Sequence, residues 1–398
     1  MTLKNKRIVL GVCGGIAAYK SILLLRLLKK EGAHVRVIMT KNAGYFVGPT
    51  TFEALSEKPV CMDLFEKTDD AAISHIKWAD EADAVVVAPA TANMIAKMAN
   101  GLADDALSTF LLAVTTPVLV CPAMNTNMLL HPATQRNLET LRSDGFEVLE
   151  TDFGKMACGT TGPGRLPDAE YILDRLKACL FSKDYEGKTV LVSAGPTREF
   201  IDPVRFISNP SSGKMGYAIA RAAEQRGACV ILVTGPTALE APYHVEALPV
   251  DSARDMAKAV FENMDRADVI IKTAAVGDYR AKTQADQKIK KQNEELVLEL
   301  VQNQDILKEL GARKTRQFLV GFAAETRDLA ANAGEKLKKK NLDIIVGNLV
   351  GSPDSGFQAD TNKVTLFFKD GSSEALPLLG KDEVAHILLD RILEKNGN

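Results

Sequence analysis

Short apolar runs alternate with helix-type patterns along this chain, and the alternation begins twice. Residues 7–12 (RIVLGV) form the first apolar run, leucines recur at helical spacing over 23–28, and a second run covers 35–39. Such an alternation is typical of parallel strands buried between helices. Three later segments continue it: 84–88 as a strand, 92–113 as a helical stretch and 118–120 as a strand.

The alternation restarts near residue 189, where TVLVS at 189–193 predicts a strand and 211–226 predicts a helix. The two halves share a local likeness, since KEGAHV at 30–35 resembles QRGACV at 225–230. We therefore predict an α/β protein with two Rossmann-like domains, each built on an open parallel sheet. The remaining strands predicted in the second half are 229–234, 268–272, 318–320 and 343–347.

The length of 398 residues also favours two domains, because a single hydrophobic core usually stops growing well before that size. A polar segment at 182–188 separates the two patterns. We expect the boundary there, with domains at 1–185 and 186–398.

The amino-acid composition limits the kinds of molecule that the chain is expected to bind. Lys and Arg number 49 against 51 for Asp and Glu, so the net charge of -2 gives no electrostatic footprint for nucleic acid or for an anionic membrane. No apolar run is long enough to cross a bilayer, and no signal-peptide core follows Met1. The six cysteines have no Cys-x-x-Cys spacing. We expect a cytoplasmic protein that binds small molecules and whose cysteines are mostly reduced, buried core residues.

The loops that follow the strands of the first half are the candidate site, because ligands bind at the carboxyl ends of such strands. The Gly14-Gly15 turn either binds a phosphate at a helix start or is a plain tight turn. It lacks the G-x-G-x-x-G order, and no acidic residue follows the strand that ends at Thr40, which argues against NAD. Cys158 lies among glycines and threonines, a polar setting that favours a chemically active thiol. His75, taken alone, is more often structural than catalytic.

Several segments of the first half together resemble the flavin-dependent cysteine decarboxylases, the phosphopantothenoylcysteine decarboxylases in particular, over about residues 6–180. The resemblance implies an FMN that oxidises the thiol-bearing carbon of the substrate, so that the carboxylate leaves as CO2, after which the reduced flavin returns a hydride. The segments that carry the resemblance are GGIAAYK at 14–20, His75, PATAN at 89–93, PAMN at 122–125 and ACGTTG at 157–162.

The resemblance also implies roles for single residues. His75 would be the base of the oxidation, Asn125 would bind the substrate carboxylate, and Cys158 would donate a proton. Leu129 stands where the family often has an aromatic residue, which predicts an altered pocket wall. The residues implied to bind FMN are Gly14, Gly15, Ile16, Thr40, Pro89, Ala90, Thr91 and Asn93.

The second half carries motifs of a different kind. SSGKMG at 211–216 opens a helix and is either a phosphate-binding loop or a plain N-cap and turn. It is not a P-loop, because Ser208 replaces the first glycine and Met215 replaces the magnesium-binding hydroxyl residue. Lys288 and Lys290 alternate along an extended segment, which taken alone is more often a solvated face.

In combination these segments resemble the phosphopantothenate–cysteine ligases over about residues 188–395. The resemblance implies that the carboxylate of 4'-phosphopantothenate attacks the α-phosphate of a nucleotide, that pyrophosphate leaves, and that the amine of cysteine then displaces the nucleotide monophosphate. Positive charge and Mg2+ would stabilise the transferring phosphate. Members fused to the decarboxylase use CTP, which is therefore the expected nucleotide. The segments are DPVRFISN at 202–209, SSGKMG at 211–216, TAAVGDY at 273–279, NQDI at 303–306, GFAAET at 321–326 and the lysines at 336–340.

By this resemblance Lys288 would form the acyl-nucleotide, Asn209 would convert it to product, Arg205 with Asn209 would bind the substrate, and Asp278 would contact Mg2+. Two departures from the family pattern are Gly277 and Gln304, and neither removes a charge. The residues implied to bind CTP are Ala274, Ala275, Asp278, Lys288, Asn303, Asp305, Ile306, Phe322, Lys336 and Lys340.

The chain is thus expected to be a bifunctional enzyme that makes 4'-phosphopantetheine from 4'-phosphopantothenate, cysteine and CTP. Two alternatives stay open at this point: an NAD(P)-dependent dehydrogenase with tandem Rossmann domains, and a non-catalytic flavoprotein regulator. The resemblance further implies a homo-oligomer, with trimeric decarboxylase domains and dimeric ligase domains.

Overall fold

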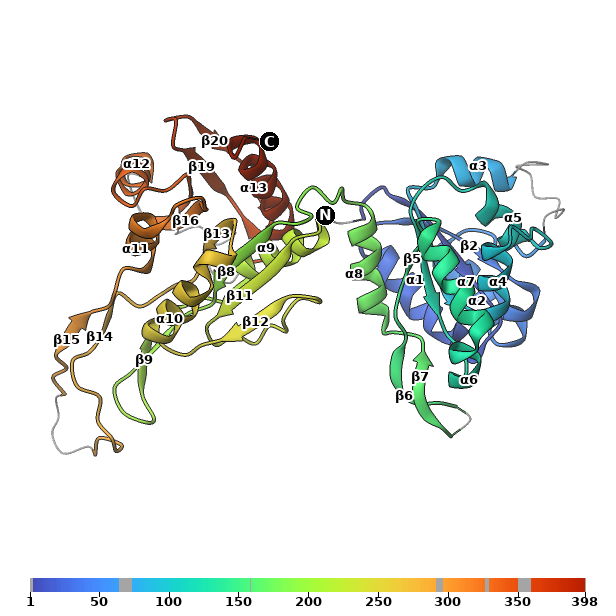
Figure 1. Ribbon diagram of the computed structural model, residues 1–398, viewed down its shortest axis with the longest axis horizontal. Helices are drawn as coiled ribbons and strands as arrows, with labels where there is room; N and C mark the ends of the chain where they lie inside the picture. The colour runs from blue at the N-terminus through green and yellow to red at the C-terminus, as the bar shows by residue number, and fades with distance from the viewer. Residues whose placement is uncertain are drawn as a thin grey trace. The chain divides into compact units, whose positions relative to one another are not determined.

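The computed structural model describes residues 3–63, 74–157, 159–290, 296–325, 329–349 and 359–397. The chain divides into two compact units, Met1–Ser182 and Lys183–Asn398 (Figure 1). The division falls in the polar segment in which the sequence places the boundary between 185 and 186.

The first unit contains a five-stranded parallel sheet in the order β2-β1-β3-β4-β5. Its strands are β1 (Arg7–Val12), β2 (His34–Met39), β3 (Ala84–Ala90), β4 (Val118–Pro122) and β5 (Glu147–Val148), with a separate hairpin of β6 (Asp152–Lys155) and β7 (Thr161–Arg165). Its helices are η1 (Ile16–Tyr19), α1 (Lys20–Lys30), η2 (Lys41–Tyr45), α2 (Pro49–Ser56), α3 (Ser74–Glu81), α4 (Ala92–Ala99), α5 (Ala106–Ala113), α6 (Thr126–Leu130), α7 (Pro132–Ser143) and α8 (Ala169–Cys179).

Helices cover both faces of this sheet, because alternate strand residues belong to two different buried clusters. Ile8 and Leu10 pack with α1 and α8, whereas Val9 packs with α4, α5 and α7. The helical stretch predicted over 92–113 is two helices. Gly101 has φ of +66°, and the Asp105 side chain caps the start of α5.

The second unit is built on an eight-stranded sheet in the order β12-β11-β8-β13-β16-β17-β19-β20. The first six of these strands run parallel, and β19 and β20 add to one edge in antiparallel fashion, which the sequence analysis did not predict. The strands of the sheet are β8 (Thr189–Ala194), β11 (Cys229–Thr234), β12 (Glu246–Pro249), β13 (Val269–Lys272), β16 (Phe318–Glu325), β17 (Ile344–Leu349), β19 (Val364–Phe368) and β20 (Ser373–Ala375). The helices are α9 (Lys214–Gln225), α10 (Ala253–Asn263), η3 (Met264–Arg266), α11 (Ile306–Arg313), α12 (Leu329–Lys339) and α13 (Lys381–Lys395).

Three two-stranded pairs complete the second unit: β9 (Arg198–Phe200) with β10 (Phe206–Ser208), β14 (Tyr279–Ala281) with β15 (Leu300–Gln302), and β18 (Thr361–Asn362) with β21 (Leu379–Gly380). The β14–β15 pair extends away from the large sheet in Figure 1.

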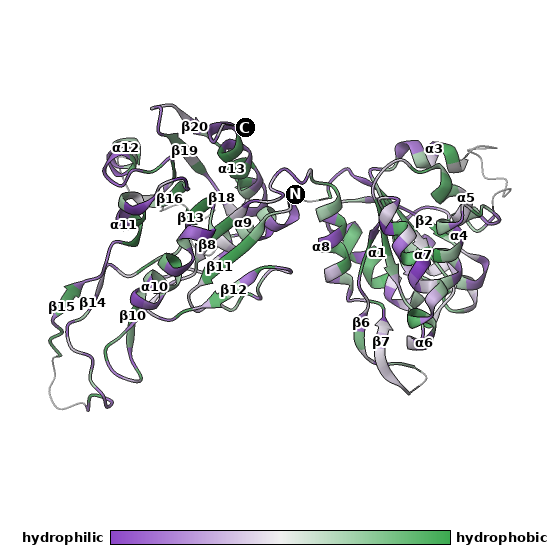
Figure 2. Ribbon diagram, viewed as in Figure 1, coloured by the Kyte–Doolittle hydropathy of each residue, from purple (hydrophilic) through white to green (hydrophobic). Residues whose placement is uncertain are grey.

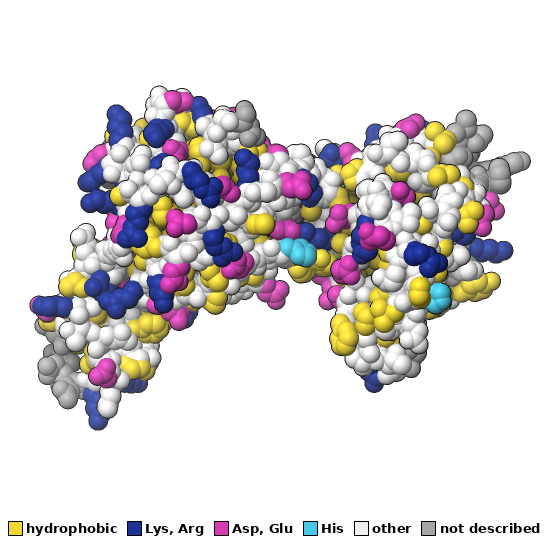
Figure 3. All heavy atoms as spheres, viewed as in Figure 1, with side chains coloured by type: hydrophobic (Ala, Val, Ile, Leu, Met, Phe, Trp, Pro, Cys, Tyr) yellow, Lys and Arg dark blue, Asp and Glu magenta, His cyan; other side chains and the backbone are white. Residues whose placement is uncertain are grey.

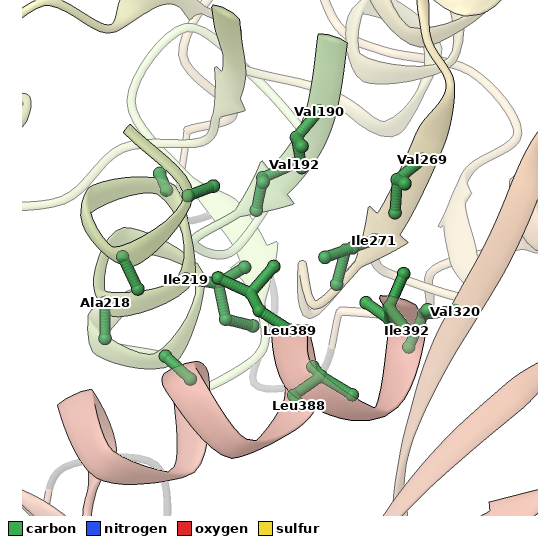
Figure 4. Close-up of a cluster of buried hydrophobic side chains, with 14 of the residues drawn as sticks. Val190, Val192, Ala218, Ile219, Val269, Ile271, Val320, Leu388, Leu389 and Ile392 are labelled. Carbon is green, nitrogen blue, oxygen red and sulfur yellow. The ribbon is translucent and has the colours of Figure 1, made fainter. Parts of the chain in front are cut away.

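The second unit also has a helix layer on each face of its sheet. Figure 4 shows Ala218 and Ile219 of α9 and Leu388, Leu389 and Ile392 of α13 in one buried cluster with strand residues such as Val192 and Ile271. Residues of α10, α11 and α12 form the cluster on the opposite face. The central strands are hydrophobic along their length (Figure 2). The expected α/β architecture of two Rossmann-like units is confirmed.

On the face shown in Figure 3, basic and acidic side chains are interspersed over both units. Among the described residues, no helix combines the length and the apolar character needed to cross a bilayer.

Candidate active sites

In the first unit, the loops that follow the central strands meet at the carboxyl edge of the sheet. The Cys13 N–H donates to the Pro89 carbonyl at 3.2 Å, which ties the loop after β1 to the end of β3. The Ala123 N–H donates to the Ala90 carbonyl at 3.0 Å, which ties in the loop after β4. The segments that contain the predicted FMN-binding residues therefore converge.

The Gly14-Gly15 turn requires glycine at its first position. A Cβ atom on Gly14 would lie 2.6 Å from the backbone carbon of Asn42, in the loop after β2, so this close approach excludes a side chain. Thr40 lies in the same loop, and its N–H donates to the Val12 carbonyl at 3.0 Å. The turn thus brings the loops after β1 and β2 together.

The residues at this edge fit a flavin. Within the described residues, a Cβ atom on Gly15 would meet only Thr91 within 4 Å, at 3.9 Å. The turn is therefore open in front of the start of η1, where a phosphate can bind backbone N–H groups. The Ile16 side chain is 63% exposed and offers an apolar surface to a ring. The Thr91 side chain caps α4 by accepting from the Met94 N–H, and Asn93, two residues after Thr91, is exposed.

The loop that carries Asn125 is joined to the β6–β7 hairpin. Asn125 caps α6, its side-chain oxygen accepting from the Asn127 N–H at 2.9 Å, and the neighbouring Met124 N–H donates to the Gly164 carbonyl at 3.0 Å. Two predicted catalytic groups lie outside the described part of the chain: Cys158, between β6 and β7, and the side chain of His75, whose backbone is in α3.

The described cysteines correct one expectation. Cys13 and Cys121 are buried core residues, and burial raises the pKa of the Cys13 thiol to about 12. Cys61 and Cys179 are only partly buried, however, and Cys229 is exposed at the start of β11, so most of the described cysteines are not fully buried. Half-exposed positions at strand starts and helix ends tolerate a small thiol as well as the core does.

In the second unit, a cavity of about 570 Å³ lies at the carboxyl ends of the central strands. Its volume is in the range of small-molecule sites. Apart from Arg205 and Lys288, the residues predicted for the ligase all line it: Asn209, Ala274, Ala275, Asp278, Asn303, Asp305, Ile306, Phe322, Lys336 and Lys340.

The loop after β13 is held in place from two sides. The Gly277 N–H donates to the Thr197 hydroxyl at 2.9 Å, and the Asn303 side chain donates to the Gly277 carbonyl at 2.8 Å. Asn209 donates through its side-chain amide to the Val276 carbonyl at 3.1 Å. Asn209 and Asn303 therefore fix the backbone of the loop that ends at Asp278.

A lysine–aspartate pair lies at the helix side of the cavity. The Lys340 ammonium is 2.8 Å from the Asp305 carboxylate, which also caps α11 through the Lys308 N–H. Burial favours the protonated acid, yet the Lys340 ammonium and the Lys308 N–H hold the pKa of Asp305 below its ordinary value.

Lys288 and Arg205 do not line the cavity, but one buried carboxylate connects their segments. Asp202 is fully buried, and it accepts from the Arg205 guanidinium at 2.9 Å and from the Ile289 N–H at 3.1 Å. Asp202 therefore holds the segment that carries Lys288 against the loop that carries Arg205 and leads to Asn209.

The start of α9 also contributes to the cavity, which is lined by residues 209–216. Gly213 precedes the helix with φ of +77°, and a Cβ atom there would lie 2.8 Å from the Thr237 side chain, so this residue is a conformationally required N-cap. The helix predicted from 211 begins at Lys214. The first N–H groups of α9 face the cavity. This geometry is compatible with both alternatives that the sequence left open, an anion-binding loop and a plain N-cap and turn.

Sequence reasoning missed several cavity residues. Lys272 ends β13, Asn348 lies near the end of β17, Asn362 ends β18 and Lys381 begins α13. Burial and the neighbouring Lys340 ammonium lower the pKa of Lys272 to about 8. The one local signal was the lysine at the end of the apolar run 268–272, because a charged residue rarely ends a buried strand without a ligand or partner.

Comparison with known proteins identifies the family. Residues 1–181 match the family model described as Flavoprotein, and residues 185–395 match that of the DNA/pantothenate metabolism flavoprotein C-terminal domain. The coenzyme A biosynthesis bifunctional protein CoaBC of Bacillus subtilis is 51% identical over 98% of this chain and 97% of its own length. The chain belongs to the CoaBC family.

A second curated CoaBC protein supports the family assignment. The CoaBC protein of Escherichia coli strain K12 is 46% identical over 99% of this chain and 98% of its own. A solved C-terminal domain of a CoaBC protein is 49% identical, with a TM-score of 0.46 over 53% of this chain and 96% of that one.

This CoaBC chain is a bifunctional enzyme of coenzyme A biosynthesis, with a flavoprotein decarboxylase half that binds a flavin and a ligase half. These relatives give no support to the NAD(P)-dependent dehydrogenase or to the non-catalytic regulator.

Proposed function

We propose that the second unit joins 4'-phosphopantothenate to cysteine in a reaction that consumes CTP. The first unit then uses FMN to decarboxylate the ligated product to 4'-phosphopantetheine. The observation that best supports the ligase half is the single cavity that gathers residues from the loop after β13, from α11, from α12 and from β16. Family membership supports the pairing of the two activities in one chain.

In the ligase half, the lysines supply positive charge where a phosphate reacts. Lys336 and Lys340 would bind CTP, with Asp278 contacting the Mg2+ that accompanies the phosphates. Lys288, held near by the Asp202–Ile289 contact, would stabilise the transition state that forms the acyl-cytidylate. Asn209, next to the fixed loop after β13, would orient that intermediate for attack by the amine of cysteine.

In the decarboxylase half, FMN would supply the oxidation and the returned hydride that make loss of CO2 possible. Asn125, anchored as the cap of α6, would hold the substrate carboxylate. His75 would accept the proton lost in the oxidation, and Cys158 would donate the proton that completes the product. Gly14, Gly15, Ile16, Thr40, Pro89, Ala90, Thr91 and Asn93 would hold the FMN.

We place the enzyme in the cytoplasm as a homo-oligomer of trimeric decarboxylase units and dimeric ligase units. Size-exclusion chromatography with light scattering tests this assembly. A mass of several chains supports it, and a monomer at micromolar concentration contradicts it.

Substitution of one lysine tests the ligase half. Lys288→Gln is expected to lower the rate of pyrophosphate release from CTP by about 100-fold or more, because it removes a charge that stabilises the transition state. Lys290→Gln is the matched control, since it removes the same charge two residues away and is expected to keep most of the activity. Mass spectrometry of the parent should detect CMP, and greater turnover of ATP than of CTP would contradict the choice of nucleotide.

A further inference from the structure

Lys272 brings a positive charge into the ligase cavity without a protein group to pair with it. It is the last residue of β13, and its side chain is partly buried and lines the cavity. Within the described residues, this side chain forms no hydrogen bond or ion pair. Because charged groups that leave water are normally paired, the ammonium of Lys272 lacks a partner that its position calls for.

The alternation of side chains along β13 directs Lys272 toward the helix layer of α10, α11 and α12. Val269 and Ile271 belong to the core on the α9–α13 face of the sheet, whereas Ile270 belongs to the core on the opposite face. Since successive side chains of a strand point to opposite faces, Lys272 points to the same side as Ile270. At the end of the strand this side opens into the part of the cavity where α11 begins and α12 ends.

Two carboxylates near Lys272 do not neutralise its charge. The Asp305 carboxylate is already paired with the Lys340 ammonium at 2.8 Å, and it accepts from the Lys308 N–H at 3.0 Å. Asp278 attracts the Lys272 ammonium but forms no ion pair with it within the described residues. Burial and the Lys340 ammonium outweigh both carboxylates and lower the pKa of Lys272 to about 8. The surroundings therefore leave the charge of Lys272 uncompensated.

An anionic ligand in the cavity would supply the missing partner. Lys272 and Lys340 repel each other, and an anion with several oxygens can accept hydrogen bonds from both ammonium groups. A triphosphate has such oxygens on each of its phosphates. A buried charge that lowers the stability of the folded chain is the kind of cost that proteins retain at functional sites.

We propose that Lys272 is a nucleotide-binding residue of the ligase half, with its ammonium donating to a phosphate of CTP on the side of the cavity where Lys340 lies. The resemblance to the ligases leaves Lys272 without a role, so this contact adds to those that the family motifs imply. The assignment rests on the proposed ligase function. The other anion that the reaction brings is 4'-phosphopantothenate, and the experiment below separates the two substrates.

The test compares two substitutions at this position in the full-length protein. Lys272→Met removes the charge at similar side-chain length and is expected to raise the KM for CTP about tenfold or more, because a hydrogen bond between charged groups is lost. Lys272→Arg keeps the charge and is expected to hold the KM for CTP closer to that of the parent. The KM values for 4'-phosphopantothenate and for cysteine should stay near those of the parent in both variants.

Calorimetric unfolding distinguishes a binding role from a structural one. CTP with Mg2+ should raise the unfolding temperature of the second unit, since a ligand that binds only the folded state stabilises it. In Lys272→Met this rise should be smaller, although the unit without nucleotide is no less stable than in the parent. A residue that only supports the fold would not give this combination. Lys258→Met removes an ammonium from a side chain that is 74% exposed on α10, and this control should respond to CTP as the parent does.

The possible outcomes separate the contact from the function on which it rests. An unaltered KM for CTP in Lys272→Met overturns the proposal, and so does a raised KM for 4'-phosphopantothenate alone, which assigns the ammonium to that substrate. A parent that releases no pyrophosphate from CTP in the presence of 4'-phosphopantothenate and cysteine instead refutes the ligase function itself.

Discussion

Lys272 is a cation at the end of a buried strand, where it lies between small neighbours. It pairs in register with Ser193 of β8 and Gly321 of β16. The charged groups around it are Lys340, Asp305 and Asp278, and it forms no hydrogen bond or ion pair within the described residues. The charged form is therefore disfavoured in the folded chain.

The pH dependence of the free energy of unfolding tests whether burial disfavours the charged form of Lys272. The pKa of Lys272 falls from 10.5 to about 8 on folding, so at pH 7 both states are protonated and the full cost of burying the charge is present. The cost disappears as the pH rises from 8 toward 10.5, because the unfolded state then binds more protons than the folded one. Lys272→Met is expected to stabilise the second unit at pH 7 by about 2 kcal/mol, and by less at higher pH.

Calorimetric unfolding with and without the substitution measures this difference. The single tryptophan, Trp78, lies in the first unit, so its fluorescence identifies the transition that belongs to that unit. Lys258→Met on α10, where the side chain is 74% exposed, is the control and should change the stability little. Equal effects of both substitutions, or a destabilised Lys272→Met, would contradict the account.

Residues with a role in a local motif could be predicted, whereas residues brought together by the sheet could not. Asp278 and Asn303 belong to short motifs, and the structure brings them to one cavity. Asn348 and Asn362 are single asparagines without a local pattern. They become neighbours only through the pairing of β17 with β19, an antiparallel addition that the apolar pattern did not predict.

The packing of the loops after β1 and β2 makes a prediction for the flavin site. Gly14→Ala would place a Cβ atom 2.6 Å from the Asn42 backbone, which must shift. We expect a loss of about 1 to 3 kcal/mol of stability in the first unit and reduced flavin absorbance per chain.

Gly48→Ala is the control for this substitution, since Gly48 has φ of -66° and no described atom lies within 4 Å of an added Cβ atom. Full flavin content in purified Gly14→Ala would show that the close approach of these loops does not shape the site.

The strands and the helix break that the sequence analysis did not predict lack a clear apolar pattern. The sequence of β7 is TGPGR, and its glycines and proline are residues that do not indicate a strand. β14 and β15 are only three residues long each. The helix predicted over 92–113 was broken because Asn100 and Gly101 end α4, while Lys97 reaches across to pair with Asp104 and Asp105. The long buried parallel strands, by contrast, begin within one residue of their predicted starts because their apolar runs are uninterrupted, although β16 extends to Glu325, five residues beyond its predicted end.

At the scale of the whole molecule, contacts near the junction set where the second unit begins. Tyr185 is fully buried, and its hydroxyl donates to the Leu389 carbonyl at 2.7 Å, while Asp184 pairs with Arg226 at 2.6 Å. A fragment that starts at 186 lacks both. It is expected to be less stable than a fragment that starts at 183 by about 3 to 5 kcal/mol, the usual cost of removing a large buried aromatic side chain. Urea unfolding of the two fragments measures this, and equal midpoints would contradict it.

The central claim is that one chain carries two consecutive reactions in two units, and complementation tests it most directly. Lys288→Gln and Cys158→Ala are each supplied with 4'-phosphopantothenate, cysteine, CTP and Mg2+, and the products are identified by mass spectrometry. The account predicts that Cys158→Ala joins cysteine to 4'-phosphopantothenate but makes no 4'-phosphopantetheine. Lys288→Gln is expected to form little of the ligated compound. A mixture of the two variants is expected to make 4'-phosphopantetheine. Failure of the mixture, with the unsubstituted chain active, would contradict a division of the two reactions between separately working sites.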